Sequence, residues 1–147
     1  MKKVLFLFVS TLLISASFVS CSSDDDKSGS DSEALIIGKW NLYKETEFTN
    51  GQLEYEELYE HLCPSKKDYV EFKASGEFTQ SFYDEACEVD TNATTYSISG
   101  DYILIDNEDE DEAMSLKIKT LNSSTLIVES EEEWEGVTYK YVTELRK

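Results

Sequence analysis

The side chains best suited to chemistry in this chain are three cysteines. Cys63 and Cys87 lie in a stretch rich in aromatic and β-branched residues, and Cys21 follows an apolar N-terminal segment. A pair of thiols can bind a metal ion, carry out redox reactions or form a structural disulfide. No C-x-x-C spacing and no cluster of histidines accompanies Cys63 and Cys87, which disfavours the first two roles. We therefore expect neither a bound metal nor another cofactor.

His61, the only histidine, has no partner for catalysis. It cannot be one of two histidine ligands of a metal ion, and the chain contains no G-x-S-x-G elbow whose serine it would activate. The 31 acidic residues offer many carboxylate pairs for acid–base catalysis, but this abundance singles out no pair. We expect His61 to be an exposed polar residue and the protein not to be an enzyme.

Residues 106–112 form an acidic run that could supply oxygen ligands to Ca²⁺, a hard cation. An EF-hand loop has glycine at its sixth position and glutamate at its last, where this chain has Asp111 and Lys117. The better interpretation of this run, and of the glutamates at 131–133, is a solvated turn.

Residues 1–20 have the composition of a signal peptide. A charged start is followed by an apolar run that two hydroxyl residues interrupt. A membrane-spanning helix needs about 20 apolar residues, so this run is too short to stay in the membrane. The junction of Ser20 and Cys21 resembles a lipobox, with Phe18 in the place where leucine is usual. This resemblance implies a bacterial lipoprotein in which Cys21 is acylated and becomes the N-terminus; the alternative is an ordinary secreted protein.

Residues 21–33 form a linker rich in serine and aspartate, with little to bury in a core. Its composition resembles the signal that sends some Gram-negative lipoproteins to the outer leaflet of the outer membrane. The alternative is a solvated linker that happens to be acidic. The expected location is therefore the outer membrane, with a lipid on Cys21 as the anchor and the domain exposed at the cell surface.

The charge of the chain limits its partners. Its 13 basic and 31 acidic residues give a net charge of −18, and residues 1–20 contain two of the lysines and no acid. Such a surface repels phosphate backbones, which argues against nucleic acid as a partner. It would approach anionic lipids only through its acyl chains. Residues 34–147 suffice for one hydrophobic core, and we expect a monomer.

Residues 34–147 have the pattern of an all-β domain, with short aromatic and β-branched runs between turn signals. In the first run Trp40, Leu42 and Lys44 share one face, while Glu45 lies on the other. Eight antiparallel strands joined by short turns can remove their exposed edges by closing into an up-and-down barrel. The eight candidate strands are residues 36–48, 68–73, 77–83, 94–99, 101–106, 113–121, 125–130 and 137–146.

A short helix is predicted between the first two strands. Four residues there fall at i, i+3, i+4 and i+7, the spacing of one helix face. They are Tyr55, Leu58, Tyr59 and Leu62. Pro64 lacks an amide hydrogen and should end this helix.

The clearest local prediction is a hairpin of residues 68–73 and 77–83. The loop between them contains Gly76, which can adopt the left-handed conformation that such loops require. In this register the numbers of paired residues add up to 150, so that Phe72 faces Phe78 across the two strands.

The same register, extended outward, places Cys63 opposite Cys87, because their numbers also add up to 150. Exported chains meet an oxidising compartment, so we expect these two cysteines to form a disulfide. In the chain-entropy model a disulfide that closes a loop of this length contributes about 3 kcal/mol to the free energy of unfolding.

Gly38-Lys39-Trp40 matches the G-x-W element that opens lipocalins, and the series of strands resembles the small lipocalin-like domains of bacterial lipoproteins. The resemblance covers residues 36–147 and implies a lipocalin barrel whose base is closed by Trp40. It also implies that Arg146, the only arginine, packs across the indole, which contributes about 0.5–2 kcal/mol. The Thr-Asp-Tyr motif that lipocalins carry before a later strand is missing.

Inward-facing apolar side chains are the candidates for ligand binding. Eight-stranded barrels can enclose a pocket for a small apolar molecule, and a filled core is the alternative. The candidate residues are Trp40, Phe72, Phe78, Phe82, Tyr96, Leu116, Tyr139 and Tyr141. We expect a lipid-anchored, lipocalin-like protein of the cell envelope that binds a small apolar ligand without enzymatic activity. The rival function is a structural or interaction module that docks on envelope machinery with a filled barrel.

Overall fold

The computed structural model describes residues 33–106 and 113–147. The expected signal peptide, Cys21 with most of the linker, and residues 107–112 of the acidic run lie outside the described residues. In the described part of the chain, no helix is long and apolar enough to cross a membrane.

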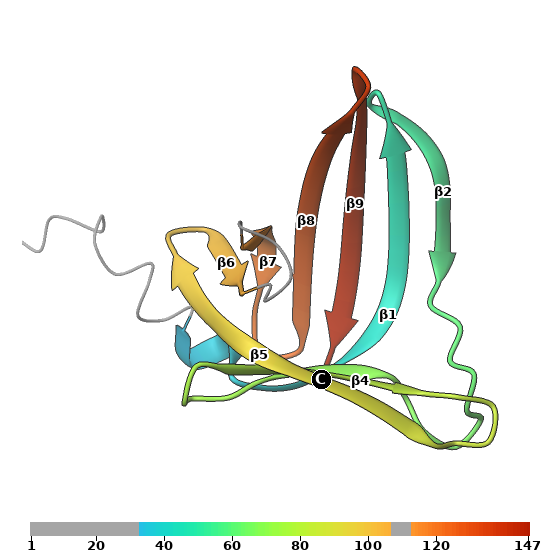
Figure 1. The fold of residues 1–147 in the computed structure, drawn as a ribbon, viewed down its shortest axis with the longest axis vertical. Coiled ribbons are helices and arrows are strands. Elements are labelled where there is room, and N and C mark those ends of the chain that lie inside the picture. The colour runs from blue at the N-terminus through green and yellow to red at the C-terminus, as the bar shows by residue number, and fades with distance from the viewer. Residues whose placement is uncertain (1–32, 107–112) are drawn as a thin grey trace, which may run out of the picture.

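Within these residues the chain folds into nine antiparallel strands (Figure 1). Their order in the sheet is β2-β1-β3-β4-β5-β6-β7-β8-β9, and β1 also pairs with β9, which closes the barrel. The strands are β1 (Gly38–Thr49), β2 (Gln52–Leu58), β3 (Tyr69–Phe72), β4 (Glu77–Tyr83), β5 (Val89–Ser99), β6 (Tyr102–Ile105), β7 (Met114–Leu121), β8 (Thr125–Trp134) and β9 (Val137–Arg146). The predicted all-β barrel is confirmed, and each of the eight predicted strands has its counterpart.

β2 and β3 share one position in the barrel. β1 pairs with β2 through its second half and with β3 through its first half. Between the two, the amide of Tyr59 donates to the carbonyl of Tyr43 at 2.9 Å, and the amide of Leu42 donates to the carbonyl of Asp68 at 3.1 Å. Residues 60–67 therefore leave the barrel wall as a loop, which we call the excursion loop. Eight strand positions remain in the closed wall.

The helix predicted between the first two strands is wrong. Residues 52–58 form β2 instead, because Asn50 and Gly51 have φ angles of 50° and 79° and build the turn that returns the chain along β1. Helical spacing in so short a segment is a weak preference, and a ladder of backbone hydrogen bonds to β1 outweighs it. A short helix lies elsewhere, at residues 33–36, before the first strand.

A bulge at Tyr43 reverses the alternation of side chains along β1. Pairing with β9 moves from Leu42–Leu145 to Lys44–Glu144, so β1 uses two residues where β9 uses one. Beyond the bulge Lys44 lies on the outer face of the barrel and the next residue, Glu45, on the inner face. The sequence pattern predicted the opposite for both residues.

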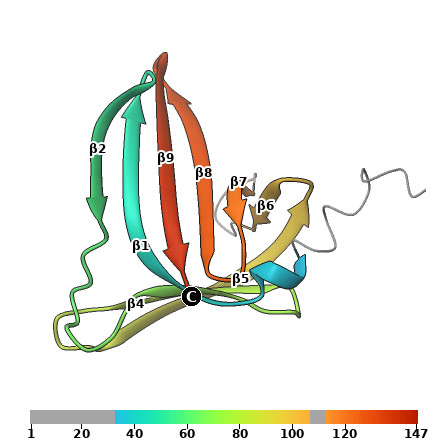
Figure 2. The same ribbon diagram turned by 180° about the vertical axis from the view of Figure 1, so that it is seen from behind.

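The hydrophobic core fills one end of the barrel, which we call the base. Ile36 and Trp40 are fully buried there, and the indole Nε1 of Trp40 donates to the carbonyl of Ile36 at 2.6 Å. The helical turn thus closes the base. Strands β8, β9, β1 and β2 stand side by side above it, while β4 and β5 lie across it (Figures 1 and 2). We call the upper part of these four strands, residues 45–58 and 130–142, the wing.

Candidate functional site

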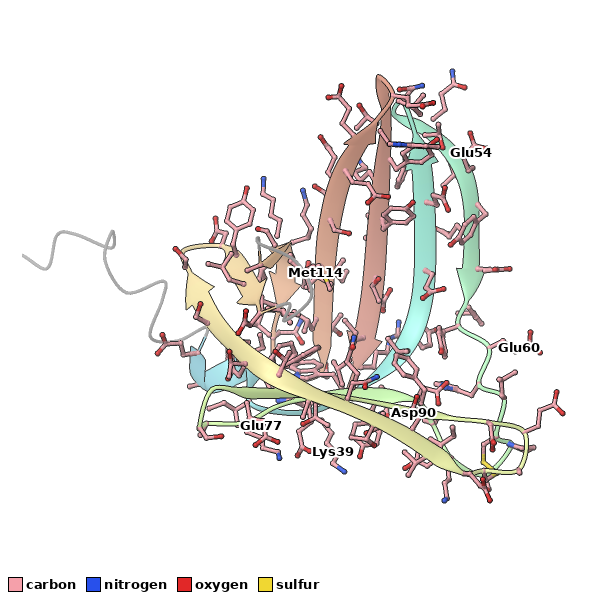
Figure 3. All side chains as sticks on the ribbon, in the orientation of Figure 1. Lys39, Glu54, Glu60, Glu77, Asp90 and Met114 are labelled. Atoms are coloured by element: carbon pink, nitrogen blue, oxygen red, sulfur yellow. A yellow bond between two sulfur atoms is a disulfide. The ribbon has the colours of Figure 1, made fainter. Side chains whose placement is uncertain are left out.

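A cavity of about 390 Å³ lies above the core, between the base and the wing. Core side chains such as Phe72, Phe78 and Leu126 form its floor. Phe82 and Met114 form its side and are 37% and 46% exposed, so solvent reaches the cavity there. Met114, labelled in Figure 3, lies between β7 and the upright strand β8.

Polar side chains interrupt this apolar lining. They are Glu45, Tyr59, Gln80, Ser130 and Thr143. Glu45 and Thr143 are direct partners across β1 and β9, and Tyr59 follows β2 immediately. No lysine, arginine or histidine is among the lining residues of this cavity. In residues 33–106 and 113–147, no group of three or more histidine, cysteine or acidic side chains is placed to hold a metal ion.

Burial changes the acidity of two lining residues. It raises the pKa of Glu45 above its usual value, and the charge of Glu57, its partner on β2, raises that pKa further. Burial also raises the pKa of Tyr59 to about 12, together with a hydrogen bond to Asp68 and the charges of Asp68 and Glu45. At neutral pH Tyr59 is therefore an uncharged hydroxyl, and the carboxyl group of Glu45 has less water around it than that of a surface glutamate.

Asp68 fastens the cavity wall to the excursion loop. This residue is 3% exposed, and its carboxylate Oδ1 accepts a hydrogen bond from the amide of Tyr83 at 2.7 Å. Its own amide donates to Nδ1 of His61 at 3.0 Å, and the ring of His61 lies edge-on to Tyr59 with centroids 5.0 Å apart. His61 is thus a half-buried acceptor in this network, which corrects the expectation of an exposed residue on a helix.

The predicted disulfide between Cys63 and Cys87 is confirmed, with Cα atoms 5.0 Å apart. It joins the excursion loop to the turn between β4 and β5. The predicted register of the β3–β4 hairpin is also confirmed, but its ladder ends at the pair Tyr69–Ser81. The cysteines therefore meet through their loops and not by continued pairing. The link fixes the loop that follows Tyr59, a lining residue.

Four of the predicted binding residues line the cavity: Phe72, Phe78, Phe82 and Leu116. Two others pack next to it. Trp40 lies beneath it in the base, and Tyr96 packs edge-on against Phe72 with ring centroids 5.0 Å apart. The hydroxyl of Tyr96 donates to the carbonyl of Lys73 at 3.1 Å, so its polar end is already satisfied.

Tyr139 and Tyr141 lie on the inner face of the wing, beyond the cavity. They lie on the same face of β9 as Thr143, at every second position, and Thr143 lines the cavity. Sequence reasoning missed Glu45 and Tyr59 as lining residues. The bulge in β1 conceals the first, and the predicted helix misplaced the second.

Arg146 does not pack on Trp40, as the resemblance to lipocalins implied. It pairs with Asn41 and shares the outer face of the barrel, where its guanidinium carbon lies 3.5 Å from the ring centroid of Tyr43. Lys147 occupies the expected place instead, with Nζ 4.3 Å from the ring of Trp40. Its Nζ also donates to two backbone carbonyls beside the helical turn, at 3.0 and 2.9 Å.

Gly38 allows the chain to pass from the helical turn into β1. Its φ of 117° is a conformation that residues with a Cβ rarely adopt. A Cβ at this position would make only an ordinary contact with the side chain of Lys147, at 3.6 Å, so the backbone conformation alone favours glycine here. The G-x-W element therefore has two structural functions: its glycine makes the backbone turn, and its tryptophan fills the base.

A closed antiparallel barrel of eight strand positions, with a short helix before its first strand and an interior cavity, is the lipocalin fold. The sequence profile of the lipocalin-like domain family matches residues 36–128. The chain therefore belongs to the lipocalin-like domain family.

Solved structures of similar fold include a bacterial and a crustacean protein. A lipocalin-like protein from Bacteroides uniformis is 18% identical with a TM-score of 0.50, and the match covers 76% of this chain and 97% of that chain. Lobster apocrustacyanin A1 is 14% identical with a TM-score of 0.54, and the match covers 80% of this chain and 63% of that chain. At these identities the likeness shows the fold alone. No curated protein matches the chain.

Proposed function

We propose that this protein binds a small, largely apolar molecule in its barrel cavity, without enzymatic activity. The observation that carries the proposal is a cavity of about 390 Å³ with a mainly aliphatic and aromatic lining, open to solvent past Phe82 and Met114. Sites for small molecules typically have volumes of roughly 300–1,000 Å³ and this kind of lining. Membership of the lipocalin-like family supports the same function, because that fold is known for binding small hydrophobic ligands.

The rival function, a docking module with a filled barrel, has less support. A filled barrel would leave no room for a ligand. The observation in its favour is the exposure of Leu53, Leu58 and Trp134 on the wing. Single exposed apolar residues are common on protein surfaces, and these three come from two different strands.

The cavity assignment is tested by filling the cavity. Thr143 lines it, while the neighbouring Val142 faces the outer surface of the same strand. Thr143→Phe should lower the affinity for the neutral fluorophore diphenylhexatriene at least ten-fold, whereas Val142→Phe should leave it unchanged. The mature chain is used, residues 21–147 with Cys21→Ser, so that neither lipid nor detergent competes for the probe. Equal affinities of the two variants would overturn the proposal.

The second part of the proposal is a lipid anchor at Cys21 that holds the protein at the outer membrane. Its support is the signal-like segment and the Ser20–Cys21 junction. Twelve positions separate Cys21 from Glu33, where the helical turn of the base begins, and such a tether spans at most about 40 Å. The anchor would thus attach at the base, the end of the barrel opposite the wing.

The anchor is tested by acyl labelling in the bacterial cell. Cys21→Ser should abolish incorporation of labelled palmitate and release the protein from the outer-membrane fraction. A Cys21→Ser protein that still carries lipid would show that the lipoprotein assignment is wrong.

A further inference from the structure

Among the described residues, the cavity lining contains one charged side chain, the acidic Glu45. Tyr59 is neutral because its pKa is about 12, and the other polar lining side chains are uncharged. A wholly uncharged ligand would cover this carboxylate without giving it a partner, which opposes binding. A ligand with a positive group near Glu45 would compensate the charge as it displaces water.

The inner face of the wing continues this negative character beyond the cavity. Glu45 pairs with Glu57 on β2, and Glu47 pairs with Tyr55 on β2 and with Tyr141 on β9. Directly paired residues of antiparallel strands share one face of the sheet. Burial and the charges of the three glutamates raise the pKa of Tyr55, as expected when these groups lie close together.

Tyrosine rings lie among these carboxylates. The hydroxyl of Tyr141 donates to Oε1 of Glu132 at 3.3 Å, and Tyr139 pairs directly with Glu132 across β8 and β9. Burial, followed by the charges of Glu132 and Glu47, raises the pKa of Tyr141, so this ring also stays neutral. Neutral aromatic faces beside carboxylates are the surroundings that an organic cation prefers.

The basic residues of the same strands lie on the opposite face. Nζ of Lys44 is 3.3 Å from the carboxylate of Glu56, and Nζ of Lys140 lies 4.4 Å from the ring centroid of Phe48. Among the described residues, no ion pair joins a basic side chain to the inner-face glutamates of the wing. These inner-face carboxylates are Glu45, Glu47, Glu57 and Glu132. Within residues 33–106 and 113–147, the carboxylates on the wing side of the cavity are therefore not neutralised by a basic side chain.

We propose that the ligand is an amphiphilic organic cation, with an apolar body in the cavity and an amine or quaternary ammonium group beside Glu45, on the wing side of the cavity. This inference rests on the proposed function, because both place the ligand in the same cavity. The cavity points to a ligand, and the carboxylate in its lining specifies the charge of that ligand. The neutral tyrosines next to it favour an organic cation over a hydrated metal ion.

The test uses three probes with one apolar body: diphenylhexatriene, its trimethylammonium derivative and its propionate derivative. Each is titrated by fluorescence into the mature Cys21→Ser chain at 150 mM salt, where distant surface charges are screened. The cationic probe should bind at least ten-fold more tightly than the anionic one. Glu45→Gln should reduce this ratio at least three-fold. Glu133→Gln, on the outer face of β8, removes the same charge and should leave the ratio unchanged.

The outcomes separate the two proposals. If the three probes bind equally and Thr143→Phe blocks all of them, the ligand lies in the cavity but the inference about its charge is wrong. If Glu45→Gln and Glu133→Gln lower the preference for the cationic probe equally, that preference comes from the overall charge of the protein, and the inference is overturned as well. If no probe binds, or if Thr143→Phe has no effect on binding, the proposed function itself fails.

Discussion

Strands β1, β8 and β9 run from the base into the wing, and their inner faces carry different side chains in the two regions. At the base β1 and β9 present Leu42 and Leu145 to the interior, and farther along the same two strands the inner face carries Glu45, Glu47 and Tyr141. Strand alternation, together with the bulge at Tyr43, directs all of these side chains inward, so the difference lies in residue type. We infer that the base stabilises the fold and that the wing supplies the polar groups for recognition.

The two tryptophans give the strongest test of this comparison. Trp40 is fully buried in the base, whereas Trp134 is 66% exposed at the end of the wing. Trp40→Ala should lower the free energy of unfolding by about 3–5 kcal/mol, because it leaves a large cavity in the core. Trp134→Ala should change it by less than about 0.5 kcal/mol. Urea unfolding followed by far-ultraviolet circular dichroism measures both, and similar losses would refute the division into two regions.

The disulfide should give the next largest effect. Removing it with Cys63→Ala and Cys87→Ala should lower the free energy of unfolding by about 3 kcal/mol, because the unfolded chain is no longer constrained. Local opening should concentrate in the excursion loop. Amide hydrogen exchange should therefore accelerate in residues 60–67 and 84–88 well before it does so around Trp40. Uniform acceleration over the whole barrel would contradict this localisation.

A smaller effect distinguishes the two basic residues at the end of β9. Lys147→Ala removes a cation over Trp40 and two hydrogen bonds beside the helical turn, and should cost about 1–2 kcal/mol. Arg146→Ala removes an outer-face contact with Tyr43 and an ion pair with Glu144, and should cost about 0.5 kcal/mol. Thermal unfolding of the two variants compares them. A larger loss of stability for Arg146→Ala would indicate that Arg146, and not Lys147, stabilises the base, as the lipocalin resemblance implied.

The predictions that held are those in which local pattern and turn chemistry agree. The β3–β4 hairpin has apolar residues on one face and a glycine in its loop, so that a slip of one residue would mix its faces. Its register is the predicted one, with Phe72 opposite Phe78, and Lys73 pairs with Glu77 as an ion pair. The disulfide followed from the same register, although loops bring the cysteines together.

The features that sequence could not predict depend on pairing between distant segments. The bulge at Tyr43 and the excursion loop occur at the same height of the barrel, on the two edges of β1. The bulge has no marker in its own sequence, because alternation along β1 continues without a glycine or proline. In the excursion loop, Pro64 marked only the end of a segment that was predicted to be a helix. The inward turn of Glu45 follows from the bulge, so the one charged lining residue was placed on the wrong face.

The mildest test concerns the cost of keeping Glu45 in the cavity wall. Burial raises the pKa of Glu45 in the folded protein above its ordinary value of 4.5, and the charge of Glu57 on β2 adds to this. The folded state therefore binds the proton more tightly than the unfolded chain. The stability linked to this proton is present at low pH and is lost as the pH rises through the folded pKa. Ionised Glu45 thus destabilises the protein at pH 7.

Glu45→Gln should consequently raise the free energy of unfolding at pH 7, by less than about 1 kcal/mol because solvent screens a partly exposed group. The difference should disappear near pH 3, where the glutamate is protonated in both states. Glu133→Gln, on the outer face, removes the same charge outside the cavity and is the matched control. A loss of stability in Glu45→Gln at pH 7 would indicate a favourable interaction that outweighs burial. A substitution that stabilises the free protein and weakens binding of the cationic probe would mark Glu45 as a residue kept for recognition at the expense of stability.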